Sequence, residues 1–164
     1  MTIRRAHAVA DADADAAANI LAEAAAWLIA GGRKLWDPDE IALANIELRA
    51  AAGELVLVFE GAEPVACMFL QAEDRMHWPD AMPGDAFYVH RLAVRRNHAG
   101  TGWSQRLLDW AAEEARRNGR NFVRLDSEDR PRLLRLYEDA GFRRVDAEPF
   151  DTGRHLVIRF ERRV

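Results

Sequence analysis

Hydrophobic positions near the N-terminus recur at the three-to-four-residue spacing of a helix. They are Ile20, Ala24, Trp27 and Leu28, which follow aspartates at positions 11, 13 and 15 and end at Gly31-Gly32. Acidic residues are favourable at the positive end of a helix dipole, and glycine commonly ends a helix. Asp37-Pro38 is a typical helix start and predicts a second helix that ends at Gly53. Residues 2–9 precede this helix pair and are a candidate edge strand.

Apolar runs predict five further strands, and helical spacing predicts two further helices. The strands are expected over residues 55–60, 65–71, 86–94, 122–126 and 155–162, and the helices over residues 102–118 and 131–140. The turn 61–64 joins the first two of these strands as a hairpin, and residues 73–84 are expected to form a loop. This order predicts a three-layer α/β fold, with a central mixed, mostly antiparallel sheet flanked by helices. We expect one domain over residues 1–164.

Composition narrows the class of protein. The chain has 164 residues, 49% of them hydrophobic, and a net charge of -4, which argues against nucleic acid as a partner and slightly favours a cationic substrate. The single cysteine, Cys67, lies in an apolar run and is interpreted as a buried structural thiol. We find neither a signal peptide nor an apolar run long enough to cross a membrane, so we expect a cytoplasmic protein without membrane contact.

The turn after the strand at 86–94 is the most informative segment. Small residues at Gly100, Gly102 and Ser104 let a ligand approach the backbone, and the free amides of the following helix suit a phosphate group. The alternative is a plain loop before an ordinary helix. A nucleoside-triphosphate loop is excluded because no Lys-Ser or Lys-Thr pair follows the last glycine. A dinucleotide fingerprint lacks its third glycine at Gln105 and comes late in the chain, so it stays a weak alternative in which Asp126 binds ribose.

Three segments together resemble the GNAT superfamily of N-acetyltransferases: residues 87–94, 100–108 and 133–142. The cofactor motif of that family, Gln/Arg-x-x-Gly-x-Gly/Ala, falls on residues 99–104 with two departures, at Ala99 and Ser104. The resemblance implies acetyl-CoA as co-substrate. Its pantetheine arm would pair with the backbone of Leu92, Ala93 and Val94, and its pyrophosphate would bind at Ala99, Gly100, Thr101, Gly102, Trp103 and Ser104. Arg95 or Arg96 would compensate for the missing side chain at Ala99, and Arg130-Pro131 replaces the usual Asn-Pro pair.

The resemblance also implies direct attack of an amine on the thioester, with a main-chain amide near Leu92 as the oxyanion donor. Tyr137 matches the family tyrosine beside the cofactor sulfur and would be the proton donor to the thiolate; the alternative is a packing role in its helix. His90 shares a strand face with Tyr88 and resembles a histidine of arylalkylamine acetyltransferases. It would be the general base, the alternative being a core histidine.

Other polar and aromatic residues carry weaker hypotheses. The remaining histidines, His7, His77, His98 and His155, are scattered without metal-ligand spacing, so we expect no metal site. Trp36 and Trp78 are weak candidates for substrate contact. Glu60 and Asp85 are more typical of solvated surface charge than of amine binding.

These observations predict an acyl-CoA-dependent N-acetyltransferase that acts on a small-molecule amine. One alternative keeps the chemistry but changes the acceptor to a protein or peptide. The other is a CoA-binding regulatory domain without turnover. A homodimer is compatible with the sequence, and the segments expected around the acceptor carry no motif that identifies it.

Overall fold

The computed structural model describes residues 1–6 and 11–164. The helices are α1 (Asp11–Ala30), α2 (Leu43–Ala51), α3 (Trp103–Arg117) and α4 (Pro131–Asp139), with single 3-10 turns at Pro38–Ile41 and Arg96–His98. The strands are β1 (Thr2–Arg5), β2 (Leu55–Glu60), β3 (Glu63–Gln71), β4 (Ala86–Val94), β5 (Phe122–Ser127), β6 (Arg143–Arg144), β7 (Phe150–Asp151) and β8 (Leu156–Arg163). The candidate strand over residues 2–9 is β1 as far as residue 5; its residues 7–9, and with them His7, lie outside the described residues.

The strands form a mixed sheet in the order β1-β2-β3-β4-β5-β8-β6, with β7 paired to β8. The pairing of β4 with β5 is parallel, whereas β1 with β2, β2 with β3, and β8 with β5, β6 and β7 are antiparallel. The predicted α/β class, with a mixed and mostly antiparallel sheet flanked by helices, is confirmed. Two compact units divide the chain: Met1–Phe69 with Arg91–Ser104, and Leu70–His90 with Gln105–Val164.

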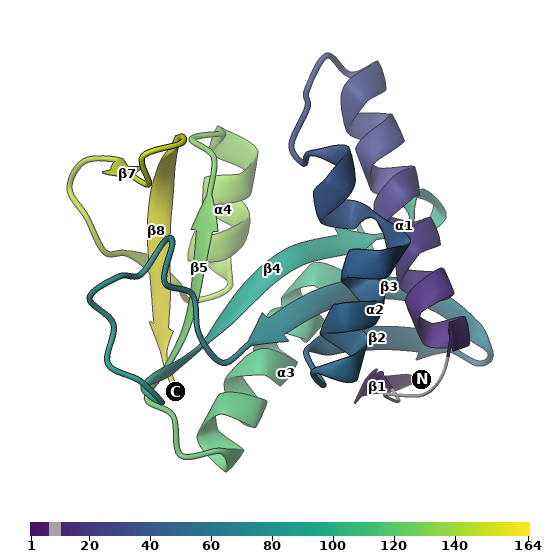
Figure 1. Cartoon of the computed structure of the whole chain (residues 1–164), viewed down its shortest axis with the longest axis horizontal. Coiled ribbons are helices and arrows are strands. Elements are labelled where there is room, and N and C mark those ends of the chain that lie inside the picture. Colours follow the sequence, from purple (N-terminus) through teal and green to yellow (C-terminus); the bar gives the residue numbers. More distant parts are fainter. Residues whose placement is uncertain (7–10) are drawn as a thin grey trace. The chain divides into compact units, whose positions relative to one another are not determined.

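The first unit is organised around one hydrophobic core. Helices α1 and α2 lie side by side (Figure 1), and their apolar faces pack against alternate residues of β2 and β3. Ile20, Leu21, Ile46, Leu55 and Leu57 are fully buried there. Cys67 belongs to the same core, and burial raises the pKa of its thiol to about 12. The interpretation of Cys67 as a buried, unreactive thiol is therefore confirmed.

The second predicted helix is divided in the structure. Glu40 accepts a hydrogen bond from the Asp37 amide at 2.9 Å, which caps the 3-10 turn Pro38–Ile41. Ala42 then adopts an extended conformation, with ψ of 144°, before α2 begins at Leu43. The helix predicted from Asp37 to Gly53 was therefore wrong in its first turns.

The second unit contains the parallel pair β4–β5 and the long antiparallel pair β5–β8 (Figure 1). The loop between β3 and β4, expected over residues 73–84, packs Trp78 against Ala86 and Tyr88. The short strands β6 and β7, which the sequence did not predict, pair with β8.

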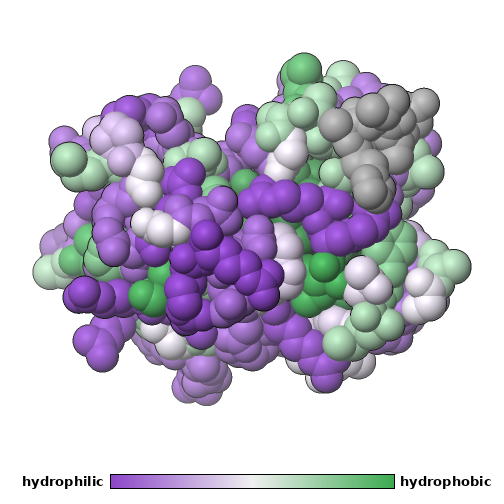
Figure 2. Space-filling view, turned by 90° about the horizontal axis from the view of Figure 1, so that it is seen from below, coloured by the Kyte–Doolittle hydropathy of each residue, from purple (hydrophilic) through white to green (hydrophobic). Residues whose placement is uncertain are grey.

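Within the described residues, no helix is long and apolar enough to cross a membrane. Figure 2 shows one face of the molecule, on which hydrophilic residues predominate and hydrophobic ones form small, separate areas outside the residues drawn in grey.

Candidate functional site

The turn before α3 has the backbone that close ligand approach requires. Gly100 and Gly102 have φ angles of 81° and 86°, a left-handed conformation that side chains disfavour. A Cβ atom built on either residue would meet nothing within 4 Å, so the space beside the turn is open. Helix α3 begins at Trp103, whose ring is buried and donates a hydrogen bond from Nε1 to Glu60 at 3.0 Å. The turn is thereby anchored while its glycines stay exposed, which fits a phosphate group.

The two arginines before this turn are engaged in other contacts. Arg95 donates to the Glu23 carboxylate at 2.9 Å and to the Pro64 carbonyl at 2.8 Å. The guanidinium of Arg96 lies over the Trp27 ring, 3.8 Å from its centroid. The structure therefore gives no support to the expectation that Arg95 or Arg96 replaces the side chain missing at Ala99.

A second group of polar residues lies where β4 and β5 stop pairing. Their parallel pairing runs from Ala86 and Phe122 to Val89 and Leu125. The next residues along the two strands are His90 and Asp126. Arg91 follows His90 with a φ angle of 53°, which is unusual for a residue with a side chain. The pairing of β4 with β5 thus ends immediately before His90, the candidate general base of the sequence analysis.

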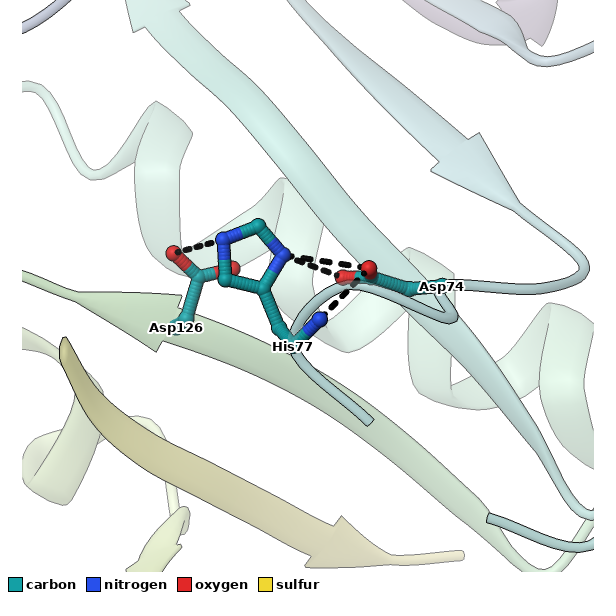
Figure 3. Close-up of side chains that lie close together, drawn as sticks. All are labelled: Asp74, His77 and Asp126. Carbon is teal, nitrogen blue, oxygen red and sulfur yellow. Dashed lines mark hydrogen bonds and ion pairs between the residues drawn. The ribbon is translucent and has the colours of Figure 1, made fainter. Parts of the chain in front are cut away.

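His90 belongs to an alternating arrangement of two imidazoles and two carboxylates. Asp74 lies 3.0 Å from His77 Nδ1 and 3.1 Å from His90 Nε2. On the other side of the rings, Asp126 lies 3.6 Å from His77 Nε2 and 3.8 Å from His90 Nδ1. Figure 3 shows the His77 ring between the two carboxylates. We call Asp74, His77, His90 and Asp126 the quartet.

The electrostatics of the quartet favour an ionised Asp74. Burial acts against its charge, but hydrogen bonds from both imidazoles, the charge of His90 and a hydrogen bond from the His77 amide outweigh burial. Together they hold the pKa of Asp74 far below its usual value. An ionised carboxylate only accepts hydrogen bonds, so in neutral rings the protons lie on His77 Nδ1 and His90 Nε2.

The loop that carries Asp74 and His77 is fixed from β8. Arg159 donates to the His77 carbonyl at 3.1 Å and to both oxygens of Asp146 at 2.6 and 2.7 Å. Its guanidinium also lies 4.9 Å from the ring centroid of Trp78. The ring of His155 lies 5.9 Å from that of His77. Two of the histidines that looked scattered in the sequence, His77 and His155, therefore lie close together in the fold, and His77 also lies beside His90.

The model of the acetyltransferase (GNAT) family matches residues 20–142, which is most of the chain. The chain belongs to the GNAT acetyltransferase family. This GNAT protein is 30% identical over 154 residues to YesJ, an uncharacterized N-acetyltransferase of Bacillus subtilis (strain 168), with 88% of the chain and 83% of YesJ covered.

Solved structures share the fold of this GNAT protein. A GNAT-family acetyltransferase from Listeria monocytogenes 4b F2365 matches with a TM-score of 0.81 and 23% identity, covering 99% of this chain and 94% of the other. The structure of yncA from Salmonella typhimurium with its cofactor acetyl-CoA matches with a TM-score of 0.71 and 20% identity, covering 99% and 93%. At such identities the likeness is evidence of the fold.

Tyr137 of the GNAT protein lies on α4, packs against aromatic rings and is influenced by the charge of Asp126. Its ring centroid is 5.7 Å from that of Phe160 and 6.3 Å from that of Phe142. Burial, and secondly the negative charge of Asp126, raise the pKa of its phenol to about 12. The hydroxyl is therefore a protonated donor at neutral pH. Because the charge of Asp126 contributes to the raised pKa, the phenol interacts electrostatically with one member of the quartet.

The structure revises several weaker hypotheses. Trp78 is only 5% exposed, and the guanidiniums of Arg124 and Arg159 each lie 4.9 Å from its ring centroid, which favours a packing role over substrate contact. Glu60 accepts a hydrogen bond from Trp103 and so supports the turn. Asp85 pairs with Arg124 at 3.2 Å.

Sequence reasoning missed two members of the quartet and gave a third another role. Asp74 and His77 lie in a loop without periodicity, and Asp126 was considered only as a ribose ligand. The spacing Asp74-x-x-His77, which lets the Asp74 carboxylate accept from the His77 amide at 3.1 Å, was the available local signal.

Proposed function

We propose that this GNAT acetyltransferase moves an acetyl group from acetyl-CoA to the amine of a small molecule by direct attack. The observation that carries the proposal is the quartet, because it supplies an oriented imidazole at the point where β4 stops pairing with β5. Acetyl-CoA supplies the acetyl group as a thioester. All other roles fall to residues of this chain.

Binding would depend on the main chain. The amides of the exposed residues Gly100 and Gly102 and of the half-buried Ser104, with the N-terminus of α3, would hold the pyrophosphate. The backbone of Leu92, Ala93 and Val94 would pair with the pantetheine arm. Ala93 turns its side chain into the core formed by α1 and α2, so this part of β4 is firmly supported. The open left-handed glycines fit such a group, and the side chain missing at Ala99 would be unnecessary because amides do most of the work.

Proton transfer would depend on the quartet and on Tyr137. An attacking amine must be neutral, and His90 would take its proton while Asp74 holds the imidazole in one tautomer. The backbone near Leu92 would donate a hydrogen bond to the developing oxyanion. Tyr137 would donate to the departing thiolate, a role supported by a phenol that stays protonated well above neutral pH.

A thiol-release assay with acetyl-CoA tests the proposal. Small primary amines, lysine-containing peptides and peptide N-termini are supplied as separate acceptors, and released CoA is measured. Turnover with the small amines supports the proposal. Turnover with peptides alone makes the protein a peptide acetyltransferase, and acetyl-CoA binding without turnover on any acceptor makes it a CoA-binding domain.

The base role of His90 is tested with a matched pair of variants. His90→Ala should lower the rate and flatten the acid limb of the pH–rate profile, with acetyl-CoA affinity nearly unchanged. His155→Ala removes a nearby histidine outside the quartet and should keep both the rate and the profile. An unchanged profile in His90→Ala would return His90 to a structural role.

A further inference from the structure

Glu23 of α1 is bonded to the segment that leads into the turn before α3. One oxygen of its carboxylate accepts a hydrogen bond from the Arg96 amide at 2.6 Å, and the other accepts one from the Arg95 guanidinium at 2.9 Å. Hydrogen bonds to an ionised acceptor are shorter and stronger than those between neutral groups. Glu23 therefore holds the backbone at the start of the turn directly, as well as through a side chain.

Two further contacts hold the same segment. Trp27 lies one helical turn after Glu23 on α1, and the Arg96 guanidinium packs over its ring, 3.8 Å from the centroid. From the side of β3, the Val65 carbonyl accepts a hydrogen bond from the Arg95 amide at 2.9 Å. The start of the turn is thus held by α1 and by β3 at the same time.

The glycines that follow present free amides. Within the residues that the structure describes, the amides of Gly100 and Gly102 make no hydrogen bond. Both glycines are exposed and left-handed. Glycine has the largest backbone freedom of any residue, so such a segment takes its conformation from what holds its ends. The His98 amide donates to the Arg95 carbonyl at 3.0 Å, which connects the glycines to the segment held by Glu23.

A carboxylate behind an anion-binding turn has two opposite effects on binding. Its charge repels an anionic ligand, but Glu23 is paired with Arg95 and 33% of its side chain is exposed, so the repulsion is weakened by pairing and by solvent. Its hydrogen bond to the Arg96 amide keeps the turn ordered before a ligand arrives, which lowers the entropic cost of binding. Because the hydrogen bond is direct and the repulsion is screened, we expect the ordering effect to dominate.

We infer that Glu23 is a positioning residue for acetyl-CoA: it holds the turn in the conformation that presents the free amides of Gly100 and Gly102 to the pyrophosphate. This inference rests on the proposed function, which places the pyrophosphate on this turn. Glu23 acts through the backbone and is assigned no contact with the cofactor. Its anchoring role gives a physical reason why the turn can bind a phosphate group without a polar side chain at Ala99.

Titration calorimetry of the full-length protein with acetyl-CoA, well below the melting temperature, tests the inference without turnover. Glu23→Gln keeps an oxygen that can accept from the Arg96 amide, whereas Glu23→Leu keeps none. We expect Kd to rise from wild type to Glu23→Gln to Glu23→Leu, by about tenfold in the last. Charge repulsion alone predicts the opposite sign, with both variants binding equally and more tightly than wild type.

Tighter or unchanged binding in Glu23→Leu would overturn the inference. Should Glu23→Leu fail to fold, Glu23→Gln decides by the sign of its change: weaker binding supports the positioning role, and tighter or unchanged binding refutes it.

Asp13→Asn is the matched control, because it removes a different carboxylate that anchors α1. Both oxygens of Asp13 accept from the Arg4 guanidinium of β1, at 2.7 and 2.9 Å. This variant should lower the melting temperature and leave Kd for acetyl-CoA unchanged. A loss of affinity in Asp13→Asn equal to that in Glu23→Leu would show that Glu23 only stabilises α1, and would refute a specific effect on the turn.

Steady-state kinetics separate the inference from the proposed function. In Glu23→Leu, KM for acetyl-CoA should rise in parallel with Kd, while kcat and KM for the amine stay close to wild type. The expected order of Kd values without acetyl transfer to any amine would refute the proposed function and leave the role of Glu23 standing. Turnover of small amines with an unchanged Kd in Glu23→Leu would do the reverse, and a wild-type protein that does not bind acetyl-CoA would overturn both.

Discussion

Asp126 and Arg159 are directly opposite each other in the antiparallel pair β5–β8, yet the Arg159 guanidinium binds Asp146. Opposite charges at paired positions of a sheet normally attract each other. Here the bidentate contact with Asp146 keeps the guanidinium engaged, and Asp126 is left to face the imidazoles. The contact also lowers the pKa of Asp146, chiefly through the hydrogen bonds from Arg159.

Removing this contact should therefore impair the site from a distance. In Asp146→Asn, Arg159 is released and can pair with Asp126, which would neutralise the charge that faces the imidazoles of His77 and His90. Under the proposed function we expect KM for an amine acceptor to rise roughly tenfold, equivalent to about 1.4 kcal/mol, while acetyl-CoA affinity stays constant. Steady-state kinetics measure both quantities. The double variant Asp146→Asn with Arg159→Gln should recover part of the loss, and an unchanged KM in Asp146→Asn would show that Arg159 does not compete for Asp126.

The turn before α3 allows a test in which strain and binding are separated. Gly102→Glu places a bulky, negative side chain at a left-handed residue beside the predicted pyrophosphate site, so it should abolish the rise in melting temperature caused by acetyl-CoA. Gly61→Glu introduces the same side chain at another left-handed glycine in the same unit, with φ of 62°, in the β2–β3 turn. It should destabilise the protein to a similar extent but keep the response to acetyl-CoA. Retained binding in Gly102→Glu would remove the basis for the proposed cofactor site.

Tyr137→Phe distinguishes a proton donor from a packing residue. The ring contacts with Phe142 and Phe160 persist in the variant, and only the hydroxyl is lost. We expect turnover to fall by about 10²–10⁴-fold with little change in melting temperature or acetyl-CoA affinity. Because the phenol titrates at about 12, the wild-type rate should show no alkaline loss attributable to Tyr137 below about pH 11. A packing role predicts the reverse: retained turnover with a loss of stability of about 1–3 kcal/mol.

Asp74 should leave a signature in the pH dependence of stability. Its pKa in the folded protein lies below that of the unfolded chain, so its stabilising contribution is present above the unfolded pKa, about 3.9, and is lost as the pH falls below it. Asp74→Asn should therefore flatten the acid side of the curve of unfolding free energy against pH. The control Asp139→Asn should leave that curve unchanged. Chemical denaturation between pH 2 and 7 supplies the measurement, and a curve for Asp74→Asn that matches wild type would contradict the proposed hydrogen bonding.

Local patterns in the sequence were sufficient for the longer strands β2 to β5 and β8 and for helices α1, α3 and α4, but not for the short strands β6 and β7 or for the start of α2. The apolar runs of β2 to β5 and β8 are long, and the helical periods of α3 and α4 are followed by glycines, so the expected bounds lie within one or two residues of the observed ones. The break at Ala42 was not predictable in this way, because alanine favours helix and only tertiary packing can override that preference.

The quartet depends on contacts between residues distant in the sequence. His90 was a candidate from the sequence because it lies in the segment 87–94, which resembles the GNAT superfamily and whose position in the fold the resemblance implies. Asp74, His77 and Asp126 come from a loop and from the next strand, and their meeting depends on how that loop is fixed by Arg159. Neither composition nor spacing encodes a distance between two side chains held by different elements, so Asp126 was considered only as a ribose ligand in a weak alternative.

Asp74 and His77 are supplied by a connection between two strands, whereas His90 and Asp126 are built into the sheet. Connecting loops accept insertions, deletions and substitutions far more readily than paired strands do. Exchange of residues 72–85 would therefore replace two members of the quartet, Asp74 and His77, in a single step, without disturbing the strands that carry the other two. If the quartet serves the acceptor as proposed, a library confined to this loop is a direct route to variants with altered acceptor preference.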